Sequence, residues 1–198
     1  MTSLRHNPTE GSPRDAYLDA ARDCILDVGW RRTTLTEVAR RAGVSRMTIY
    51  RTWPEMASLL ADLMTREWTA VVEAAAAEQP DGGAVERLVG TITATVRALR
   101  DNELFVRIVE LDPELILPYL LQRRGRSQDL VLDLTEAAIT EGQRAGEIRE
   151  GDATAMARAL LLTAHGFVLS AHTMVDDAVT MSDLDAELGT LLTRTLAR

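Results

Sequence analysis

Residues 33–53 decide the fold, and they read TTLTEVARRAGVSRMTIYRTW. Thr34 and Glu37 have the spacing of a capping box, in which the Thr hydroxyl accepts from the Glu37 N–H and the Glu carboxylate accepts from the Thr34 N–H. This pair predicts a helix over about 35–42. Gly43 ends that helix, because glycine tolerates the left-handed conformation that commonly follows a helix.

A second, shorter helix is predicted over 46–52, directly after Ser45, whose hydroxyl can cap it. Two helices joined by so short a turn cross steeply, which is the geometry of a helix-turn-helix. At about 100° per residue, Ile49 and Trp53 share one side of the second helix and are expected to pack inward. The other side and its flanks carry Arg46, Met47, Thr48, Tyr50 and Arg51.

These outward side chains have the chemistry that reads DNA. An arginine can pair with guanine O6 and N7, threonine and methionine can touch a thymine methyl group, and a tyrosine hydroxyl can bind a phosphate oxygen. None of them requires a metal or a nucleotide cofactor. The residues alone leave one alternative, a helical corner that packs without binding anything.

The rest of the chain has helical periodicity and no sustained alternation of β-branched residues, so an all-α fold is expected. Pro54 can start a helix that needs no N–H there, Asp112-Pro113 has the pattern of an N-cap and first turn, and Pro118 should end or kink its helix. The predicted helices cover 14–28, 35–42, 46–52, 54–78, 84–100, 103–111, 114–123, 127–145, 152–175 and 182–197.

Charge divides the chain unevenly. The whole sequence has 30 acidic residues against 22 basic ones, all arginine, for a net charge of −8. Residues 1–53 carry nine Arg and six acids, or +3, which leaves −11 for residues 54–198. A compact basic patch on an acidic body fits a small domain that binds a polyanion. A charged face that is only exposed to solvent would give the same count of charges.

Several other classes of protein are disfavoured. Cys24 is the only cysteine, so a disulfide framework is excluded, and a cytoplasmic protein with Cys24 in its core is expected. The apolar run at 159–175 falls short of the ~20 residues that cross a bilayer, so no membrane helix is expected. Residues 1–13 lack the apolar core of a signal peptide and are interpreted as a mobile arm.

The segment at 33–54, preceded by AARDCILDVGW at 20–30, resembles the N-terminal DNA-binding domain of the TetR family of transcriptional regulators. The likeness runs without a gap from about Tyr17 to Leu60. It implies a helix-turn-helix DNA-binding domain over 14–53 after the arm at 1–13, and a helical-bundle domain for effector binding and dimerisation over 54–198. The DNA contacts that it implies by position are Thr36, Arg46, Met47, Thr48, Tyr50, Arg51 and Thr52.

The resemblance also implies a function. It indicates a ligand-responsive regulator, a homodimer that binds double-stranded operator DNA as a repressor and releases it when a small effector binds. The sequence departs from the family pattern in two places. Met47 stands where many relatives have Gly or Pro. The helix predicted at 54–78 opens with Glu55-Met56-Ala57 instead of Ser-Lys-Glu, so the phosphate-binding lysine is missing, and nearby arginines or Arg5 are expected to replace it.

An effector pocket is predicted where large side chains from separate helices converge and where Pro118 disturbs the packing. Aromatic residues make up only 4% of the chain, so the walls should be mainly aliphatic and the effector uncharged or weakly polar, with His165 or Tyr119 as its one orienting hydrogen bond. The expected lining is Trp68, Val72, Phe105, Ile108, Leu111, Tyr119, His165 and Leu169.

A dimer interface is expected on the last two long helices, which by the resemblance pair across a two-fold axis. The helix at 182–197 has an apolar stripe about 100° wide, more than a lone terminal helix exposes safely. The stripe consists of Leu184, Leu188, Leu191 and Leu192.

Other functions have less support from the residues. An enzyme on a helical bundle would need a nucleophile with its base, or a set of metal ligands. Glu110 and Asp112 could imitate a pair of catalytic carboxylates, but Asp112 is already explained as the N-cap of the next helix. The Cα atoms of His165 and His172 are about 10.5 Å apart along a helix, too far for one zinc ion. No cofactor is expected. A third possibility keeps the DNA-binding domain but makes 54–198 a protein-interaction module without a small-molecule effector.

Overall fold

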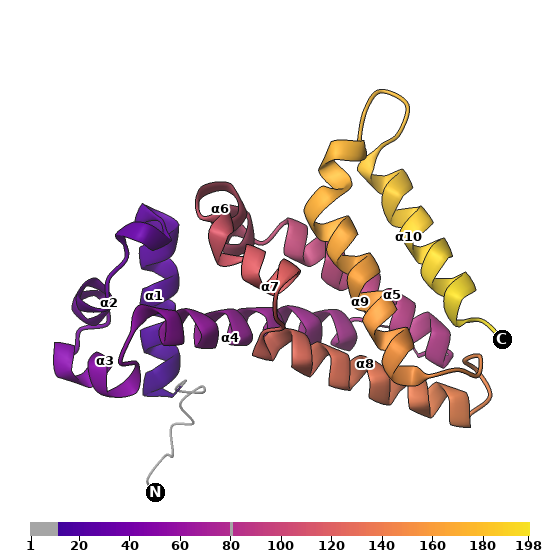
Figure 1. The fold of residues 1–198 in the computed structure, drawn as a ribbon, viewed down its shortest axis with the longest axis horizontal. Helices are drawn as coiled ribbons and strands as arrows, with labels where there is room; N and C mark the ends of the chain where they lie inside the picture. Colours follow the sequence, from indigo (N-terminus) through magenta and orange to yellow (C-terminus); the bar gives the residue numbers. More distant parts are fainter. Residues whose placement is uncertain (1–11, 80) are drawn as a thin grey trace, which may run out of the picture.

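The computed structural model describes residues 12–79 and 81–198, and every regular element in this part of the chain is a helix (Figure 1). The all-α prediction is confirmed there. The α-helices are α1 (Pro13–Val28), α2 (Leu35–Arg41), α3 (Arg46–Thr52), α4 (Met56–Ala77), α5 (Ala84–Arg100), α6 (Glu103–Leu111), α7 (Leu117–Leu121), α8 (Arg126–Arg144), α9 (Ala153–Ser170) and α10 (Met181–Leu196). Three 3-10 helices join them at η1 (Trp30–Arg32), η2 (Pro113–Leu115) and η3 (Ala171–Met174).

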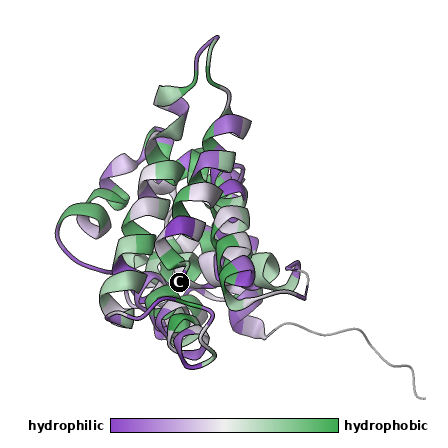
Figure 2. Cartoon of the chain, turned by 90° about the vertical axis from the view of Figure 1, so that its right-hand side faces the viewer, coloured by the Kyte–Doolittle hydropathy of each residue, from purple (hydrophilic) through white to green (hydrophobic). Residues whose placement is uncertain are grey.

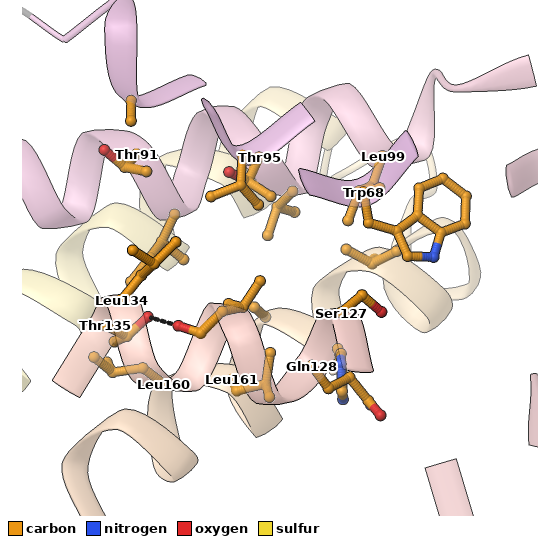
Figure 3. Close-up of a pocket in the computed structure, with 18 of the residues that line it drawn as sticks. Trp68, Thr91, Thr95, Leu99, Ser127, Gln128, Leu134, Thr135, Leu160 and Leu161 are labelled. Carbon is orange, nitrogen blue, oxygen red and sulfur yellow. Dashed lines mark hydrogen bonds between the residues drawn. The ribbon is translucent and has the colours of Figure 1, made fainter. Parts of the chain in front are cut away.

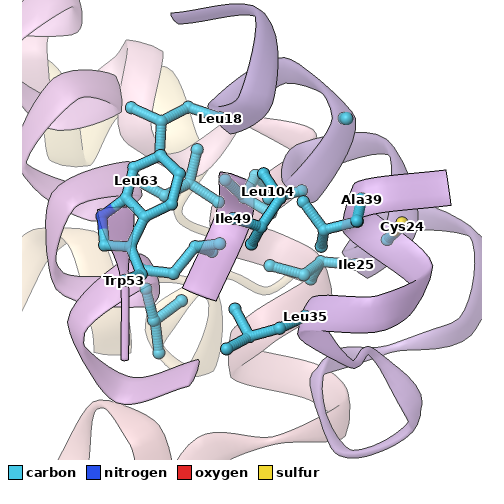
Figure 4. Packing of buried hydrophobic residues seen from close by; sticks show 14 of the residues in the cluster. Leu18, Cys24, Ile25, Leu35, Ala39, Ile49, Trp53, Leu63 and Leu104 are labelled. Carbon is cyan, nitrogen blue, oxygen red and sulfur yellow. The ribbon is translucent and has the colours of Figure 1, made fainter. Parts of the chain in front are cut away.

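One hydrophobic core lies at the N-terminal end of the molecule, where α1, α2 and α3 meet. Ile25, Leu35 and Ile49 are among its buried side chains, one from each of these helices (Figure 4). Leu63 of α4 and Leu104 of α6 lie in the same core. Two helices from beyond residue 53 therefore complete the packing of the helix-turn-helix unit.

A second core holds the remaining helices together. Val96 of α5, Ile139 of α8, Leu160 of α9 and Leu192 of α10 are buried in it. The long helix α4 packs on both α5 and α8 and runs from the helix-turn-helix unit into this body (Figure 1). Because α4 packs at both ends of the molecule, a displacement of α4 changes the packing at both ends.

The two helices of the turn begin where the sequence predicts, but one of the predicted cap bonds is wrong. Thr34 Oγ1 accepts from the Glu37 N–H at 3.2 Å, and Ser45 Oγ accepts from the Thr48 N–H at 3.1 Å. The Glu37 carboxylate does not return to Thr34, because it accepts instead from Arg40 Nε at 2.9 Å, one turn along the helix. Gly43 follows α2 with φ of +66°, a conformation that glycine adopts without strain.

Helix starts near proline differ from the sequence prediction. α1 begins at Pro13, one residue early, with Ser12 as its N-cap. Pro54 is not the first residue of α4, which begins at Met56 after Glu55. Trp53 is extended, as expected for a residue that precedes proline, but Glu55 is extended as well and takes the N-cap position, so α4 starts one residue after it.

The prediction of a single helix over 114–123 is wrong. The chain forms η2 and then the short helix α7, with Pro118 as the second residue of α7. A proline in the first turn of a helix loses no intrahelical hydrogen bond, so Pro118 starts a helix here instead of ending one. The result is a compact double turn beside the body, which carries Tyr119.

Apolar residues also reach the outside of the body (Figure 2). Leu162 of α9 is 71% exposed and Leu191 of α10 is 49% exposed. The stretch Ala153–Met174, made of α9 and η3, is long and apolar enough to cross a membrane by length and composition alone. This helical stretch is longer than the apolar run at 159–175 considered from the sequence. Only 17% of its apolar window is buried within the chain, and an apolar face of this kind commonly marks an interaction site.

Candidate nucleic-acid interface and ligand cavity

The outer face of α3 is open to solvent. Arg46, Met47, Tyr50 and Arg51 are exposed, and Met47 is 76% exposed. The candidate threonines are half-buried, Thr36 at the start of α2 and Thr48 and Thr52 along α3. The Thr52 hydroxyl donates to the Thr48 carbonyl at 3.1 Å, so it is already engaged within the helix. The side chains that project from α3 are therefore Arg46, Met47, Tyr50 and Arg51.

Positive charge is concentrated on α3. Arg46 and Arg51 have no acidic group within 4.0 Å in the part of the chain that the structure describes. On the neighbouring helix Arg40 pairs with Glu37 and Arg41 pairs with Asp27, each at 2.6 Å. Two arginines are thus left for a polyanion on the helix that would enter a groove. Arg5, the expected substitute for a phosphate-binding lysine, lies outside the described residues.

The C-terminal end of α3 is fixed by Asp62 of α4. Trp53 Nε1 donates to Asp62 Oδ2 at 2.6 Å, and the same carboxylate pairs with Arg14 of α1 and Arg126 of α8. Arg14 also lies over the Trp53 ring, 4.9 Å from its centroid. Burial alone would raise the pKa of Asp62, but the hydrogen bonds from Trp53 and Arg126 and the charge of Arg14 outweigh it and hold that pKa below its usual range.

A second contact joins the helix-turn-helix unit to the body at Asp112, which is buried. Its carboxylate accepts from the Trp30 N–H at 2.9 Å, and Arg31 Nε lies 3.5 Å away. The predicted cap role of Asp112 is wrong, because its side chain is committed to this distant backbone and not to the helix that follows. Gly29 has φ of +81° just before Trp30, which aims that N–H at Asp112.

A cavity of about 630 Å³ lies in the body, between α5 on one side and α8 and α9 on the other, with Trp68 of α4 at its edge (Figure 3). Seven of the eight predicted lining residues contribute to its wall, namely Trp68, Val72, Phe105, Ile108, Tyr119, His165 and Leu169. Leu111 is the exception. It lies at the end of α6 and is 46% exposed, so its assignment to the cavity is wrong.

Sequence reasoning missed most of the wall that α5 and α8 supply. Thr91, Thr95 and Leu99 line the cavity from α5, and Ser127 and Leu134 line it from α8 (Figure 3). The available signal was the spacing of Thr91 and Thr95, four residues apart, which places two hydroxyls on one face of the helix predicted at 84–100.

The middle of the cavity is apolar, with a few polar groups. Trp68 and Phe105 pack edge to face with ring centroids 5.6 Å apart. Thr95 Oγ1 is buried and has no hydrogen-bond partner within the described chain. Burial lowers the pKa of His165, so the imidazole is neutral at pH 7 and can accept or donate one hydrogen bond. This lining suits a mainly apolar molecule that carries a few polar atoms.

The described residues contain no group of three or more His, Cys, Asp or Glu side chains placed to hold a metal ion. Burial raises the pKa of the Cys24 thiol, which keeps it in its unreactive protonated form within the N-terminal core. His172 is exposed on η3, whereas His165 faces the cavity from α9.

The apolar stripe of α10 is divided between two environments. Leu188 and Leu192 are each 1% exposed, because they pack into the second core of their own chain. Their assignment to a dimer interface is therefore wrong. Leu191 is exposed and Leu184 is half-buried, so these two remain available to a partner. A helical period reveals an apolar face but does not tell which surface covers it.

This all-helical architecture, with an exposed basic helix in a helix-turn-helix at one end, defines a DNA-binding transcriptional regulator. The family model of bacterial regulatory proteins of the tetR family matches residues 18–63. An uncharacterized HTH-type transcriptional regulator of Mycobacterium bovis, Mb2274c, is 38% identical over 189 residues, which are 95% of each chain. The chain belongs to the tetR family.

Two solved structures share its fold. The transcriptional regulator FadR of Bacillus subtilis, in complex with stearoyl-CoA, has a TM-score of 0.64 and 21% identity and covers 92% of this chain and 98% of its own. A transcriptional regulator of Saccharomonospora viridis, in complex with choline, has a TM-score of 0.61 and 18% identity, with 96% of this chain and 100% of its own covered.

Proposed function

We propose that this regulator is a repressor, which binds its operator as a homodimer through α3 and releases it when a mainly apolar ligand enters the cavity. One observation carries the proposal, namely that α4 serves both sites. Asp62 of α4 holds Trp53 at the end of α3, and Trp68 lines the cavity less than two turns further along the same helix. A ligand that displaces α4 also displaces α3.

Two domains are proposed, although α4 and α6 also contribute side chains to the N-terminal core. Residues 14–53 would form the DNA-binding domain, and residues 54–198 the domain for effector binding and dimerisation. α3 would lie in the major groove, because its exposed arginines suit that groove's pattern of acceptors. The proposed contacts with DNA are Thr36, Arg46, Met47, Thr48, Tyr50, Arg51 and Thr52. In this role the protein acts on DNA in the cytoplasm and catalyses no reaction.

Base reading and phosphate binding can be separated at Arg46 and Tyr50. Arg46→Ala is expected to cost about 1–3 kcal/mol of operator binding and to relax the preference at one base pair, because arginine pairs with guanine through two hydrogen bonds. Tyr50→Phe should weaken all operators alike, because a phosphate contact carries no sequence information. The measurement is binding to a set of operators with single base changes. An Arg46→Ala variant that weakens every operator equally would contradict the assignment.

Dimerisation is proposed through the open faces of α9 and α10. Leu162 and Leu191 are exposed there. On the same two helices, a Cβ added at Gly166 or Gly189 would meet no atom within 4 Å, so both glycines face open space. Small residues let helix backbones approach closely, and a two-fold dimer places the same patch of both subunits face to face. Such a contact would cover the apolar surface of Ala153–Met174.

The cavity favours a small-molecule effector over a body that only binds other proteins. Its volume of about 630 Å³ falls within the usual range of roughly 300–1,000 Å³ for ligand pockets. The likeness in fold to regulators solved with stearoyl-CoA and with choline supports ligand binding by a body of this shape, without naming the ligand of this chain. A protein-interaction module would have no need of an internal space of this size.

The effector role of the cavity is tested at Trp68. Trp68→Ala should change release of the operator by the effector much more than it changes operator affinity, because Trp68 lies in the cavity wall and not at α3. Operator DNA is first selected from random sequence, and its release is then measured against a library of apolar compounds. Leu117→Ala is the control, because Leu117 is exposed on α7 outside the cavity. Unchanged release in Trp68→Ala would contradict the proposal.

A further inference from the structure

The shape of the cavity limits what it can hold. Its lining residues on α4 run from Leu60 to Ala76, which corresponds to about 24 Å at the rise of an α-helix. On α8 they run from Arg126 to Gly142, the same length. A volume of about 630 Å³ spread over that length describes a cavity that is longer than it is wide. An extended molecule that lies along the cavity fits this space better than a compact one.

The two ends of the cavity differ in charge. At the end remote from α3 the lining contains Asp81, Glu141 and Glu147 against Arg87. At the end nearer α3 the charged lining residue is Arg126, the first residue of α8, and it is followed by Ser127. The start of a long helix adds to the positive potential around Arg126. A molecule with one negative end would therefore be oriented with that end at Arg126 and its tail toward α5 and the far acids.

Arg126 is also bound to the anchor of α3. Its Nη2 pairs with Asp62 Oδ1, while Asp62 Oδ2 accepts from Trp53 Nε1 at 2.6 Å. Arg126 therefore both lines the cavity and contacts the carboxylate that holds the recognition helix, with its side chain 63% exposed. A negative group bound at the start of α8 competes with Asp62 for the same guanidinium.

We infer that the effector is an extended amphiphile with an anionic end group, and that Arg126 is the residue that recognises this group and couples it to Asp62. The inference rests on the proposed function, and it adds the chemical class of the ligand and the contact that senses it. Binding of the anion loosens the link between α8 and α4 at Asp62, and α4 then shifts together with Trp53. The uncharged effector expected from the sequence is replaced here by one with a charge at a single end.

The test uses three probes with the same tail and different ends, namely dodecanoate, dodecan-1-ol and dodecylammonium. Each is titrated calorimetrically with the full chain, the two ionic probes below their micelle concentrations and the alcohol below its solubility limit. Dodecanoate should bind about tenfold or more tighter than the alcohol, because a hydrogen bond to a charged group is stronger than one to a neutral group. Arg126→Ala should remove this advantage and leave the affinity for the alcohol within about twofold.

Arg124→Ala is the matched control. Arg124 is two residues away, is exposed, and pairs with Asp129 at 2.8 Å without lining the cavity, so its loss should leave dodecanoate binding unchanged. The coupling is read from the indole N–H resonances of the three tryptophans, assigned with Trp30→Phe and Trp68→Phe. The Trp53 resonance should shift with dodecanoate in the wild type and stay in place in Arg126→Ala.

The outcomes separate the inference from the function on which it rests. Equal affinity for the three probes, or a preference for dodecylammonium, overturns the anionic end group, and so does a loss of dodecanoate binding in Arg124→Ala as large as in Arg126→Ala. Failure of all three probes to bind overturns the extended chain. In each of these cases, release of the operator by another apolar compound would still support the proposed function. If no compound releases the operator, both the inference and the proposed function are contradicted.

Discussion

Leu162→Glu is expected to leave the chain folded but monomeric, and to reduce operator affinity by a factor of about 10²–10⁴, because a monomer loses the simultaneous binding of two half-sites. Leu162 is the most exposed large apolar side chain of α9 and contributes little to its own core. In the proposed dimer a glutamate there would be buried against apolar residues without a partner, once in each subunit.

Sedimentation and thermal unfolding check this expectation together. Leu121→Glu is the matched control, because Leu121 is as exposed as Leu162 but lies on α7, away from α9 and α10. It should stay dimeric. Leu188→Asp should unfold the chain instead of dissociating it, because Leu188 is buried in the second core. A Leu162→Glu protein that sediments as a dimer at micromolar concentration would remove α9 from the interface.

Trp53→Ala is expected to destabilise the helix-turn-helix unit by about 3–5 kcal/mol, the usual cost of truncating a buried aromatic side chain. Trp53 is among the largest fully buried side chains, and it packs edge to face with Tyr17 at a centroid distance of 6.4 Å. The truncation also leaves Asp62 without its indole donor. Operator binding should be lost in parallel, since α3 no longer has a fixed end.

Trp53→Phe is a smaller change at the same position. It keeps an aromatic ring in the core but removes the Nε1 donor and part of the indole volume, so the expected loss lies between about 1.5 kcal/mol, the low end for a hydrogen bond to a charged group, and the loss in Trp53→Ala. Urea unfolding followed by circular dichroism measures both variants. The role given to Trp53 fails if Trp53→Ala unfolds within about 1 kcal/mol of the wild type.

The residues that sequence reasoning placed well are those whose neighbours are local. Gly43 and Ser45 act within a few residues of themselves, so the turn and the start of α3 could be predicted. The face of α3 follows from helical periodicity in the same way. Seven of the cavity residues could be predicted because they are large side chains on helices that had to face inward.

The failures share the opposite cause, a partner far away in the sequence. Asp112 has the pattern of a local cap, but it binds the backbone of Trp30, 82 residues earlier. Leu188 lies on a stripe that a partner could cover, but it is buried in the second core of its own chain, where α10 packs on α5. Leu111 continues the apolar period of α6, but it lies beside Gly29, 82 residues earlier, and not at the cavity. No local pattern distinguishes these cases, because tertiary contacts decide them.

The two anchors of the helix-turn-helix unit have a consequence for the operator. Trp53 is tied to Asp62 behind α3, and Trp30 is tied to Asp112 ahead of α2. In the proposed dimer, a unit held at two separate points would turn as a rigid body, so the base contacts within each half-site would be preserved while the distance between the two half-sites changes. The proposed effector would then alter the spacing between the two recognition helices. The liganded protein should keep its affinity for an operator whose central spacer is one base pair longer or shorter, so spacer length, more than half-site sequence, distinguishes the two states.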